Sequence, residues 1–547
     1  MIKVTINKKE LEIKENALLK DLVNDFQKDY KNEIILAKVD GIYKELNDRV
    51  KKECNIEFFD LTDCGANKVY LNGLILLTVY AYKKIFGFKE NIVIRHSLDK
   101  GIYIETSNPI TLDQVERLED VMHNVVNDNL DIEKVTVSRL EAIEYFKMIN
   151  DNTKADIMKY ITSTHLTLYK LGNIYDYFYS LMPINTGVLS HFELTYLNSN
   201  GFILRFPTIY MDEKIKEFEY RSNIFNLYTE SRNWAKRLDL ENVVDLNKKI
   251  ESGKINEIIQ MDELNKNIKL MELATKILIN GKTRIILLAG PSSTGKTTTT
   301  NKLTLCLKNL GKKVYMLSMD DYFVERDQTP VDENGEYDFE RIEAVDLNLF
   351  EDCVKKLINK EEVLLPTFNF VLGKKEYNTK VKIDDDTILL VEGIHALNPM
   401  VLSGIPKEEK ATVYLSALNE LNVDTHTRIS TTDNRLLRRI VRDNRTRGLN
   451  VEQTLASWGK VRYGEENYIF PYQDEADYTF NTAMVYELGV LKTFVEPLLY
   501  SVEPSSPYYN EAVRLINFLR LFLPISSEDI PKESIIREFI GGGCFKI

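Results

Sequence analysis

The feature of this chain that most constrains its fold is a loop at residues 290–297, which reads Gly-Pro-Ser-Ser-Thr-Gly-Lys-Thr. The apolar run 284–289 directly precedes it and is typical of a buried strand, and the leucines of 298–311 recur on one side of a helix. Another apolar strand is expected at 314–319. A strand, a tight loop, a helix and a second strand in this order predict an α/β fold with a parallel sheet flanked by helices.

The residue types in this loop predict a binding site for ATP together with Mg²⁺. Glycines let the backbone curl until successive N–H groups point at one phosphate, and the N-terminus of the following helix adds its dipole. Lys296 is expected to bring a positive charge to the β- and γ-phosphates, and the hydroxyl of Thr297 to ligate Mg²⁺. The predicted ATP contacts in the loop are Gly290, Ser292, Ser293, Thr294, Gly295, Lys296, Thr297 and Thr298.

Two carboxylates at the ends of predicted strands point to phosphoryl transfer rather than to nucleotide binding alone. Asp320 follows the strand at 314–319, where a carboxylate can accept a proton from an attacking hydroxyl. Glu392 ends the apolar run 387–392, the placement of an acid that holds Mg²⁺ directly or through water. A structural or turn carboxylate is the alternative at each position.

A cluster of arginines follows in a chain whose formal net charge is −12. Four of them recur at i, i+3, i+4 and i+7, so they share one face of a predicted helix. Guanidinium groups match the geometry of phosphate, which predicts a lid that clamps the nucleotide. A solvated helix with salt bridges to Asp433 and Asp443 is the alternative. The arginines are Arg435, Arg438, Arg439, Arg442, Arg445 and Arg447.

Together these segments resemble the uridine kinase / phosphoribulokinase family of P-loop NTPases over about residues 281–480. The resemblance implies transfer of the γ-phosphoryl group of ATP to a nucleoside 5′-hydroxyl, with Asp320 and Lys296 as catalytic residues and Glu392 beside Mg²⁺. The shared segments are 290–297, Ser-Met-Asp-Asp-Tyr-Phe at 318–323, Tyr-Asp-Phe at 337–339, Pro-Thr-Phe-Asn-Phe at 366–370, Glu-Gly-Ile at 392–394, and the arginine segment from Arg438 to Gly448.

The same resemblance implies the roles of further residues. Asp338 and Arg439 match positions that hold the ribose hydroxyls, and Phe368 and Phe370 match aromatic positions that line the base pocket. The matches to lid arginines that reach the triphosphate are Arg442 and Arg447.

One departure from the family pattern leaves the accepted base open. Uridine kinases carry a histidine shortly after the aromatic segment, where it contacts the pyrimidine, but this chain has Gly373 there. Discrimination by buried hydrogen bonds is strong and discrimination by shape alone is weak. Uridine, a purine nucleoside or broad acceptance therefore remain as alternatives. So does a sugar-phosphate substrate of the phosphoribulokinase type.

The first part of the chain resembles threonyl-tRNA synthetases. Residues 1–62 have the pattern of a TGS domain, a ubiquitin-like α+β module, with a helix expected at 17–29 and a hairpin turn at Asp40-Gly41. Residues 66–235 resemble the α+β accessory domain that follows it in those enzymes. The histidines of this part lack the HxxxH spacing of the editing site, so hydrolytic editing is not expected. A regulatory protein that senses nucleotides or tRNA is the alternative from another class.

The predicted organisation comprises five segments. They are a TGS-like domain at 1–62, an accessory-like domain at 66–235, a helical connector at 236–280, a nucleoside kinase domain at 281–499 and a helical tail at 500–547.

The resemblance implies ATP and a nucleoside as partners, and composition bears on the other classes of partner. An acidic net charge of −12 disfavours bulk binding to nucleic acid. The five cysteines include no CxxC pair, which suits a reducing cytoplasm. The longest apolar stretch, near 71–82, is shorter than the roughly 20 residues of a membrane span. We therefore expect a soluble cytoplasmic protein, and a homo-oligomer is left open.

Overall fold

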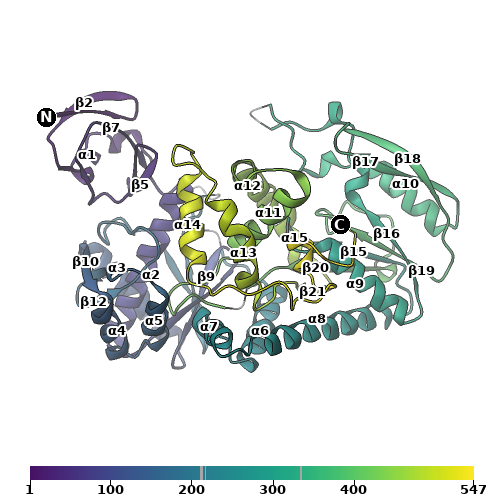
Figure 1. Ribbon diagram of the computed structural model, residues 1–547, viewed down its shortest axis with the longest axis horizontal. Helices are drawn as coiled ribbons and strands as arrows, with labels where there is room; N and C mark the ends of the chain where they lie inside the picture. Colours follow the sequence, from purple (N-terminus) through teal and green to yellow (C-terminus); the bar gives the residue numbers. More distant parts are fainter. Residues whose placement is uncertain (210–213, 216, 333–334, 420, 547) are drawn as a thin grey trace.

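The computed structural model describes residues 1–209, 214–215, 217–332, 335–419 and 421–546. In Figure 1 the first strands lie at one end of the molecule and a parallel sheet from the second half of the chain lies at the other. The long helix α8 (Ile255–Leu278) runs along the lower edge toward that sheet.

The N-terminal sheet has the strand order β2-β1-β7-β4-β5, in which only β1 and β7 are parallel. Its strands are β1 (Ile2–Ile6), β2 (Lys9–Ile13), β4 (Leu36–Val39), β5 (Ile42–Lys44) and β7 (Cys54–Phe59). The predicted hairpin turn is confirmed, because Asp40 and Gly41 adopt positive φ angles of 47° and 83° between β4 and β5.

The single helix predicted at 17–29 is wrong. The segment contains β3 (Ala17–Leu18), the short helix α1 (Leu19–Val23) and a 3₁₀ turn, Gln27–Asp29. Strand β3 pairs with β6 (Arg49–Val50), so a tertiary contact draws the start of the segment into an extended conformation that local propensity does not reveal.

The next part of the chain packs α-helices against two antiparallel sheets. The four-stranded sheet has the order β13-β14-β9-β8, and the three-stranded sheet has the order β10-β11-β12. These strands are β8 (Ile92–Leu98), β9 (Gly101–Thr106), β10 (Ile132–Ser138), β11 (His165–Leu171), β12 (Ile174–Asp176), β13 (Glu193–Asn198) and β14 (Gly201–Arg205). The helices are α2 (Cys64–Phe86), α3 (Leu112–Asn127), α4 (Arg139–Met148) and α5 (Asn152–Ile157). None of the helices described is long and apolar enough to cross a membrane.

The parallel sheet predicted for the second half of the chain is confirmed. Its strand order is β16-β19-β15-β20-β21, and all neighbours are parallel. The strands are β15 (Ile285–Ala289), β16 (Lys313–Ser318), β19 (Thr387–Glu392), β20 (Lys410–Ser416) and β21 (Tyr478–Asn481). Helices α8 and α9 (Lys296–Asn309) pack on one face of the sheet, and α10 (Leu347–Ile358) packs on the other. A separate hairpin is formed by β17 (Val363–Asn369) and β18 (Lys374–Val381).

The remaining helices connect the two halves of the chain. They are α6 (Ser222–Arg237), α7 (Val243–Glu251), α11 (Thr431–Arg447), α12 (Val451–Gly464), α13 (Glu487–Leu499), α14 (Tyr509–Leu519) and α15 (Arg537–Ile540). The largest buried apolar cluster takes residues from 142–168, 238–259 and 421–540. Because this cluster crosses the predicted domain limits, those limits stay a prediction.

Candidate functional site

The loop at 290–297 turns sharply between the end of β15 and the start of α9. Ser293 and Gly295 adopt positive φ angles of 61° and 83°, which curl the backbone around the N-terminus of the helix. The Lys296 side chain folds back over the loop, and its Nζ donates to the carbonyl oxygens of Gly290 (3.0 Å) and Pro291 (3.3 Å). The loop is therefore curled as the motif requires, with the Lys296 ammonium group beside the helix N-terminus.

The C-terminal tail reaches this loop, which the sequence did not predict. The Thr298 N–H, in the first turn of α9, donates to Glu538 Oε2 at 2.9 Å. Arg445 holds the tail through the carbonyl oxygens of Glu538 (2.8 Å) and Phe539 (3.0 Å). The Glu538 carboxylate therefore accepts a hydrogen bond from a backbone N–H group that was expected to bind phosphate. Figure 1 shows the C-terminal end of the chain lying beside β15.

Asp320 and Glu392 lie together at the carboxyl edge of the sheet, as predicted. Strands β16 and β19 are neighbours with Ser318 opposite Glu392, so the residues after each strand meet beside the loop. Burial raises the pKa of Glu392 to about 7, against the opposing charge of Lys296. The protein around Asp320 partly desolvates its carboxyl group and raises its pKa, although Lys296 and the arginines of α11 act in the opposite direction.

The oxygen atoms at this edge suit Mg²⁺. The Thr297 hydroxyl donates to the Glu392 carboxylate, so two hard oxygen ligands are adjacent. Among the residues described, no three His, Cys, Asp or Glu side chains form a complete metal site. A magnesium ion held by Thr297 and Glu392 would therefore take its other ligands from phosphate oxygens and water, which is the usual arrangement for this ion.

Two of the predicted lid arginines support the loop from behind instead. Arg435 donates from Nε to the carbonyl oxygen of Ser292 at 2.9 Å, and Arg438 donates from Nη1 to that of Ser293 at 3.3 Å. Both side chains are at most 1% exposed, and both pair with buried glutamates. The prediction that they clamp a ligand is wrong, because helix α11 is packed into the core and its amphipathic face covers the loop.

The other three arginines of the predicted site surround one buried carboxylate. Arg439, Arg442 and Arg447 each form an ion pair with Asp443, with N–O distances of 3.2, 2.7 and 3.6 Å. Arg439 also donates to the Ser292 hydroxyl at 2.9 Å. The charges of Arg442 and Arg447 act on Asp320, so both arginines lie near that carboxylate. Their contact with ATP stays a prediction.

Aromatic rings gather around Phe323, three residues after Asp320, and the Phe368 N–H donates to the neighbouring Asp321. The Phe368 ring is buried, the Phe370 ring is 55% exposed, and their centroids are 5.1 Å apart. Phe323 lies within 6.0 Å of both rings, and Phe339 packs against Phe323 at 5.9 Å. This cluster offers a flat apolar surface next to the acids. Phe323 and Phe339 were not singled out from the sequence, although each lies in a segment that was.

The backbone conformation of the turn between β17 and β18 explains why residue 373 is a glycine. Its φ angle is 67°, which closes the turn between β17 and β18, and its N–H donates to the Asn369 carbonyl oxygen at 2.7 Å. The Arg326 side chain lies within 3 Å of where a Cβ would be, and its Nη2 donates to the Phe370 carbonyl oxygen at 2.5 Å. Arg326 therefore stands close to the place where the family pattern has a histidine.

Asp338 lies beside Glu340, a residue that the sequence did not single out. The Glu340 N–H donates to Asp338 Oδ1 at 3.1 Å. Burial raises the pKa of Glu340 to about 7, against the opposing charges of Arg439 and Lys296. Glu340 directly follows the Tyr-Asp-Phe segment, which is the one signal that could have identified it.

Comparisons with known proteins give two separate similarities. The family model described as "Phosphoribulokinase / Uridine kinase family" matches residues 285–488. A uridine kinase of Staphylococcus epidermidis is 30% identical over 198 residues, which cover 36% of this chain and 86% of that protein. A solved structure titled "Structure of a Possible Uridine Kinase from Bacillus stearothermophilus" is 19% identical with a TM-score of 0.29, covering 40% of this chain and 100% of that one.

The second similarity is to threonine–tRNA ligases and concerns the N-terminal region. The ligase of Rickettsia bellii is 26% identical over 163 residues, which cover 29% of this chain and 26% of that protein. The probable cytoplasmic ligase of Encephalitozoon cuniculi is 22% identical over 247 residues, covering 44% of this chain and 37% of that protein. The chain thus spans between a quarter and two fifths of the length of these ligases.

Proposed function

The chain belongs to the phosphoribulokinase / uridine kinase family, and we propose that it transfers the γ-phosphoryl group of ATP to the 5′-hydroxyl of a nucleoside, yielding a nucleoside monophosphate and ADP. The observation that carries this proposal is the position of Asp320. It lies at the same sheet edge as Glu392, beside the loop with Lys296, and its neighbour Asp321 accepts the backbone N–H of Phe368 in the aromatic cluster.

In this mechanism each side chain has one task. Asp320 accepts the proton of the nucleoside hydroxyl as its oxygen bonds to the γ-phosphorus and the bond from that phosphorus to the β–γ bridging oxygen breaks. Lys296 leaves the carbonyl oxygens of the loop and meets the charge that spreads over the transferred group. Mg²⁺, when bound at Thr297 and Glu392, offsets phosphate charge. Arg442 and Arg447 add positive charge on the side facing Asp320.

The aromatic cluster favours a nucleoside over a sugar phosphate as acceptor. A base can stack on Phe370, whose ring is 55% exposed, whereas a sugar phosphate needs a basic pocket for its own phosphate. Arg326 lies on this side of the site, and its guanidinium group already donates to the carbonyl oxygens of Phe370 and Val371.

We also propose the five predicted domain limits and a cytoplasmic location.

A panel of acceptors tests the proposal. Purified protein with ATP labelled at the γ position should phosphorylate at least one nucleoside, and a Lys296→Ala variant should lose about 10²–10³-fold of that rate. Because Gly373 offers no side chain to the base, we expect pyrimidine and purine nucleosides to differ by less than about 10²-fold in kcat/KM.

The same panel includes ribulose 5-phosphate as an arm for the alternative substrate class. Transfer to this sugar phosphate with none to any nucleoside would reassign the acceptor. No transfer to any compound would overturn the proposal.

The contact between Glu538 and the loop leads to a further prediction. The Glu538 carboxylate accepts a hydrogen bond from the Thr298 N–H at 2.9 Å and places a negative charge where a phosphate is expected. Glu538→Gln keeps an oxygen acceptor and removes the charge, so the KM for ATP should fall by about tenfold, as a charge-assisted hydrogen bond is worth about 1.5–3 kcal/mol. Steady-state kinetics at varied ATP measure this change.

Glu533→Gln is the matched control, because Glu533 is an exposed acid in the same tail segment. Its KM for ATP should match that of the wild type. A rise in KM for Glu538→Gln would mean that Glu538 supports the loop rather than competing with phosphate.

A further inference from the structure

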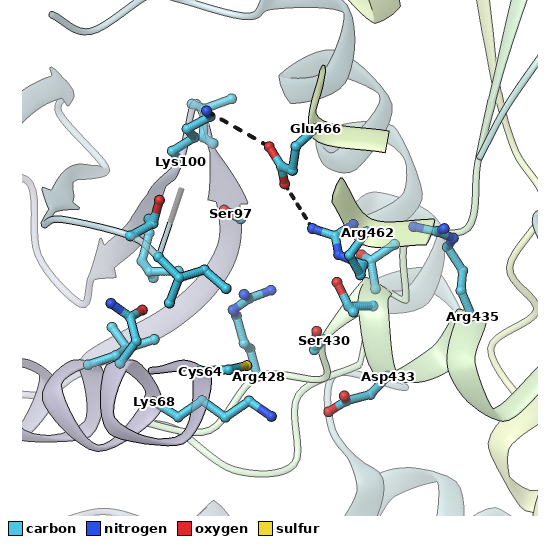
Figure 2. A pocket seen from close by; sticks show the side chains of 18 of the residues that line it. Cys64, Lys68, Ser97, Lys100, Arg428, Ser430, Asp433, Arg435, Arg462 and Glu466 are labelled. Atoms are coloured by element: carbon cyan, nitrogen blue, oxygen red, sulfur yellow. Dashed lines mark hydrogen bonds and ion pairs between the residues drawn. The ribbon is translucent and has the colours of Figure 1, made fainter. Parts of the chain in front are cut away.

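A cavity of about 1090 Å³ lies between the N-terminal region and the second half of the chain, apart from the kinase site (Figure 2). Its walls come from the start of α2, the β8–β9 hairpin, the segment between β20 and α11, and helices α12 and α14. It reaches Pro291 behind the loop, but Lys296, Asp320 and Glu392 do not line it. Its volume suits a small organic ligand.

Most charged side chains that line this cavity are already paired. Lys100 pairs with Glu466 at 3.9 Å, and Arg514 pairs with Asp433 at 2.8 Å. Lys68, on α2, similarly pairs with an acid of α14 at 3.8 Å. The lysine pairs link the N-terminal region to the second half of the chain, whereas the Arg514–Asp433 pair lies within the second half, and each pair leaves little net charge of its own.

Arg428 is the exception. Among the residues described, its guanidinium group has no hydrogen-bond or ion-pair partner, and Figure 2 shows it in the open space between Ser97 and Ser430. Burial lowers its pKa, and Asp433 and Tyr228 act in the opposite direction. Holding a cation in such surroundings without a partner is costly, so the position is suited to an anion supplied from outside.

Two further groups with unused hydrogen-bonding capacity lie at the same cavity. Helix α11 begins here at Thr431, and its N-cap Ser430 makes no side-chain cap, so the first N–H groups of a 17-residue helix remain available. His426 also lines the cavity and is 3% exposed. Its Nδ1 is 2.6 Å from Asp176 Oδ2, whereas its Nε2 has no partner among the described atoms.

We propose that this cavity binds a phosphorylated small molecule, whose phosphoryl group is held by Arg428 and the first turn of α11. Apolar side chains such as Leu71, Leu98 and Phe518 also line the cavity and can contact the rest of the ligand, and a nucleoside phosphate is the class that we propose. The feature common to the candidate ligands is a phosphate group on an organic molecule small enough for this cavity.

Helix α11 would connect this ligand to the kinase site. The helix that begins in the cavity at Thr431 carries Arg435, Arg438 and Arg439 to Ser292 and Ser293 of the loop. A phosphate that stabilises the start of this helix therefore acts on a rigid element that holds the loop, and we expect it to change the KM for ATP. The effect on turnover rests on the proposed function, but the binding does not.

Equilibrium binding tests the site without turnover. Calorimetry is carried out on the full chain carrying Lys296→Ala, which weakens binding at the loop, with inorganic phosphate, AMP and UMP as separate probes. At least one probe should bind, and the further substitution Arg428→Ala should weaken the affinity for that probe at least tenfold. The control is Arg117→Ala, which removes an exposed arginine of α3 and should change nothing.

Thr431→Asp gives a second test that does not depend on Arg428. The new carboxylate lies where the phosphate is expected and suits a helix N-terminus, so the variant should fold and lose the probe. Binding of inorganic phosphate as tightly as either nucleotide would restrict the ligand to free phosphate. Undiminished binding in both variants, or no binding of any probe, would overturn the proposal even if the kinase assay succeeds.

Discussion

Replacing Asp320 with asparagine is expected to lower kcat for phosphoryl transfer by about 10²–10⁴-fold, the usual contribution of a positioned general base. Asparagine retains the size of the side chain and cannot take the proton of the acceptor hydroxyl. Among the described residues, no hydrogen bond joins the Asp320 side chain to the loop backbone, so the KM for ATP should change by less than about threefold. Steady-state kinetics at saturating nucleoside give both values.

The neighbouring acid provides a matched control. Asp321 Oδ1 accepts the Phe368 N–H at 3.3 Å, and an asparagine can keep that bond, so Asp321→Asn should retain most of the activity. The pH profile adds a second readout. Partial desolvation raises the pKa of Asp320 above 3.8, so the wild-type rate should fall as the pH drops through that raised value. Unchanged turnover in Asp320→Asn would remove Asp320 as the base.

Replacing Lys154 with methionine is expected to destabilise the protein by about 3–5 kcal/mol, the cost of leaving buried charges without a partner. Lys154 is fully buried, and its Nζ pairs with Asp176 and lies 3.0 Å from His426 Nδ1 and 3.9 Å from Asp424 Oδ1. Methionine preserves the volume and removes the only cation of the group with a fixed charge. Urea unfolding at pH 7 measures the loss.

The pH dependence of that loss has a definite sign. Burial opposes ionisation of Asp176, but Lys154 and His426 hold its pKa below the ordinary 3.8. The stabilisation is therefore fully present above pH 3.8 and is lost as the pH falls through the lower folded value. In Lys154→Met the uncompensated carboxylates take up protons more readily, so the deficit relative to the wild type should shrink as the pH is lowered from 7 toward 4.

Lys159→Met serves as the comparison, because this exposed lysine pairs only with Asp156, at 2.8 Å. The free energy of unfolding of this variant should fall by less than about 1 kcal/mol, as for most surface ion pairs. An equally small loss for Lys154→Met would mean that the buried group contributes nothing beyond what an apolar residue of the same size supplies.

The sequence predicted those parts of the site that depend on neighbours along the chain. The loop at 290–297 carries its own glycines, and the acids Asp320 and Glu392 directly follow apolar strands. Parallel strands place their carboxyl ends at one edge, so the meeting of these acids could be predicted before their contacts were known. The hairpin turn at Asp40 was predictable for the same local reason.

Contacts between distant segments could not be predicted in this way. The bond from Thr298 to Glu538 spans 240 residues, and no motif marks the tail. The arginines of α11 have the right spacing for a phosphate clamp, yet spacing does not reveal what covers a helix face. Only the tertiary packing assigns Arg435 and Arg438 to the back of the loop. Arg428 carries no signal either, because its significance lies in the lack of a side-chain partner among the residues that the structure describes.

The largest buried cluster, which joins 142–168 and 238–259 to 421–540, bears on how this chain can evolve. Proteins assembled by gene fusion often keep their ancestral units separable, so that either can be lost or exchanged. Here the synthetase-like and kinase-like parts bury each other's apolar side chains, and loss of either would expose that surface to water. Changes of side-chain volume on one side of the cluster are therefore expected to couple to the packing of the other side.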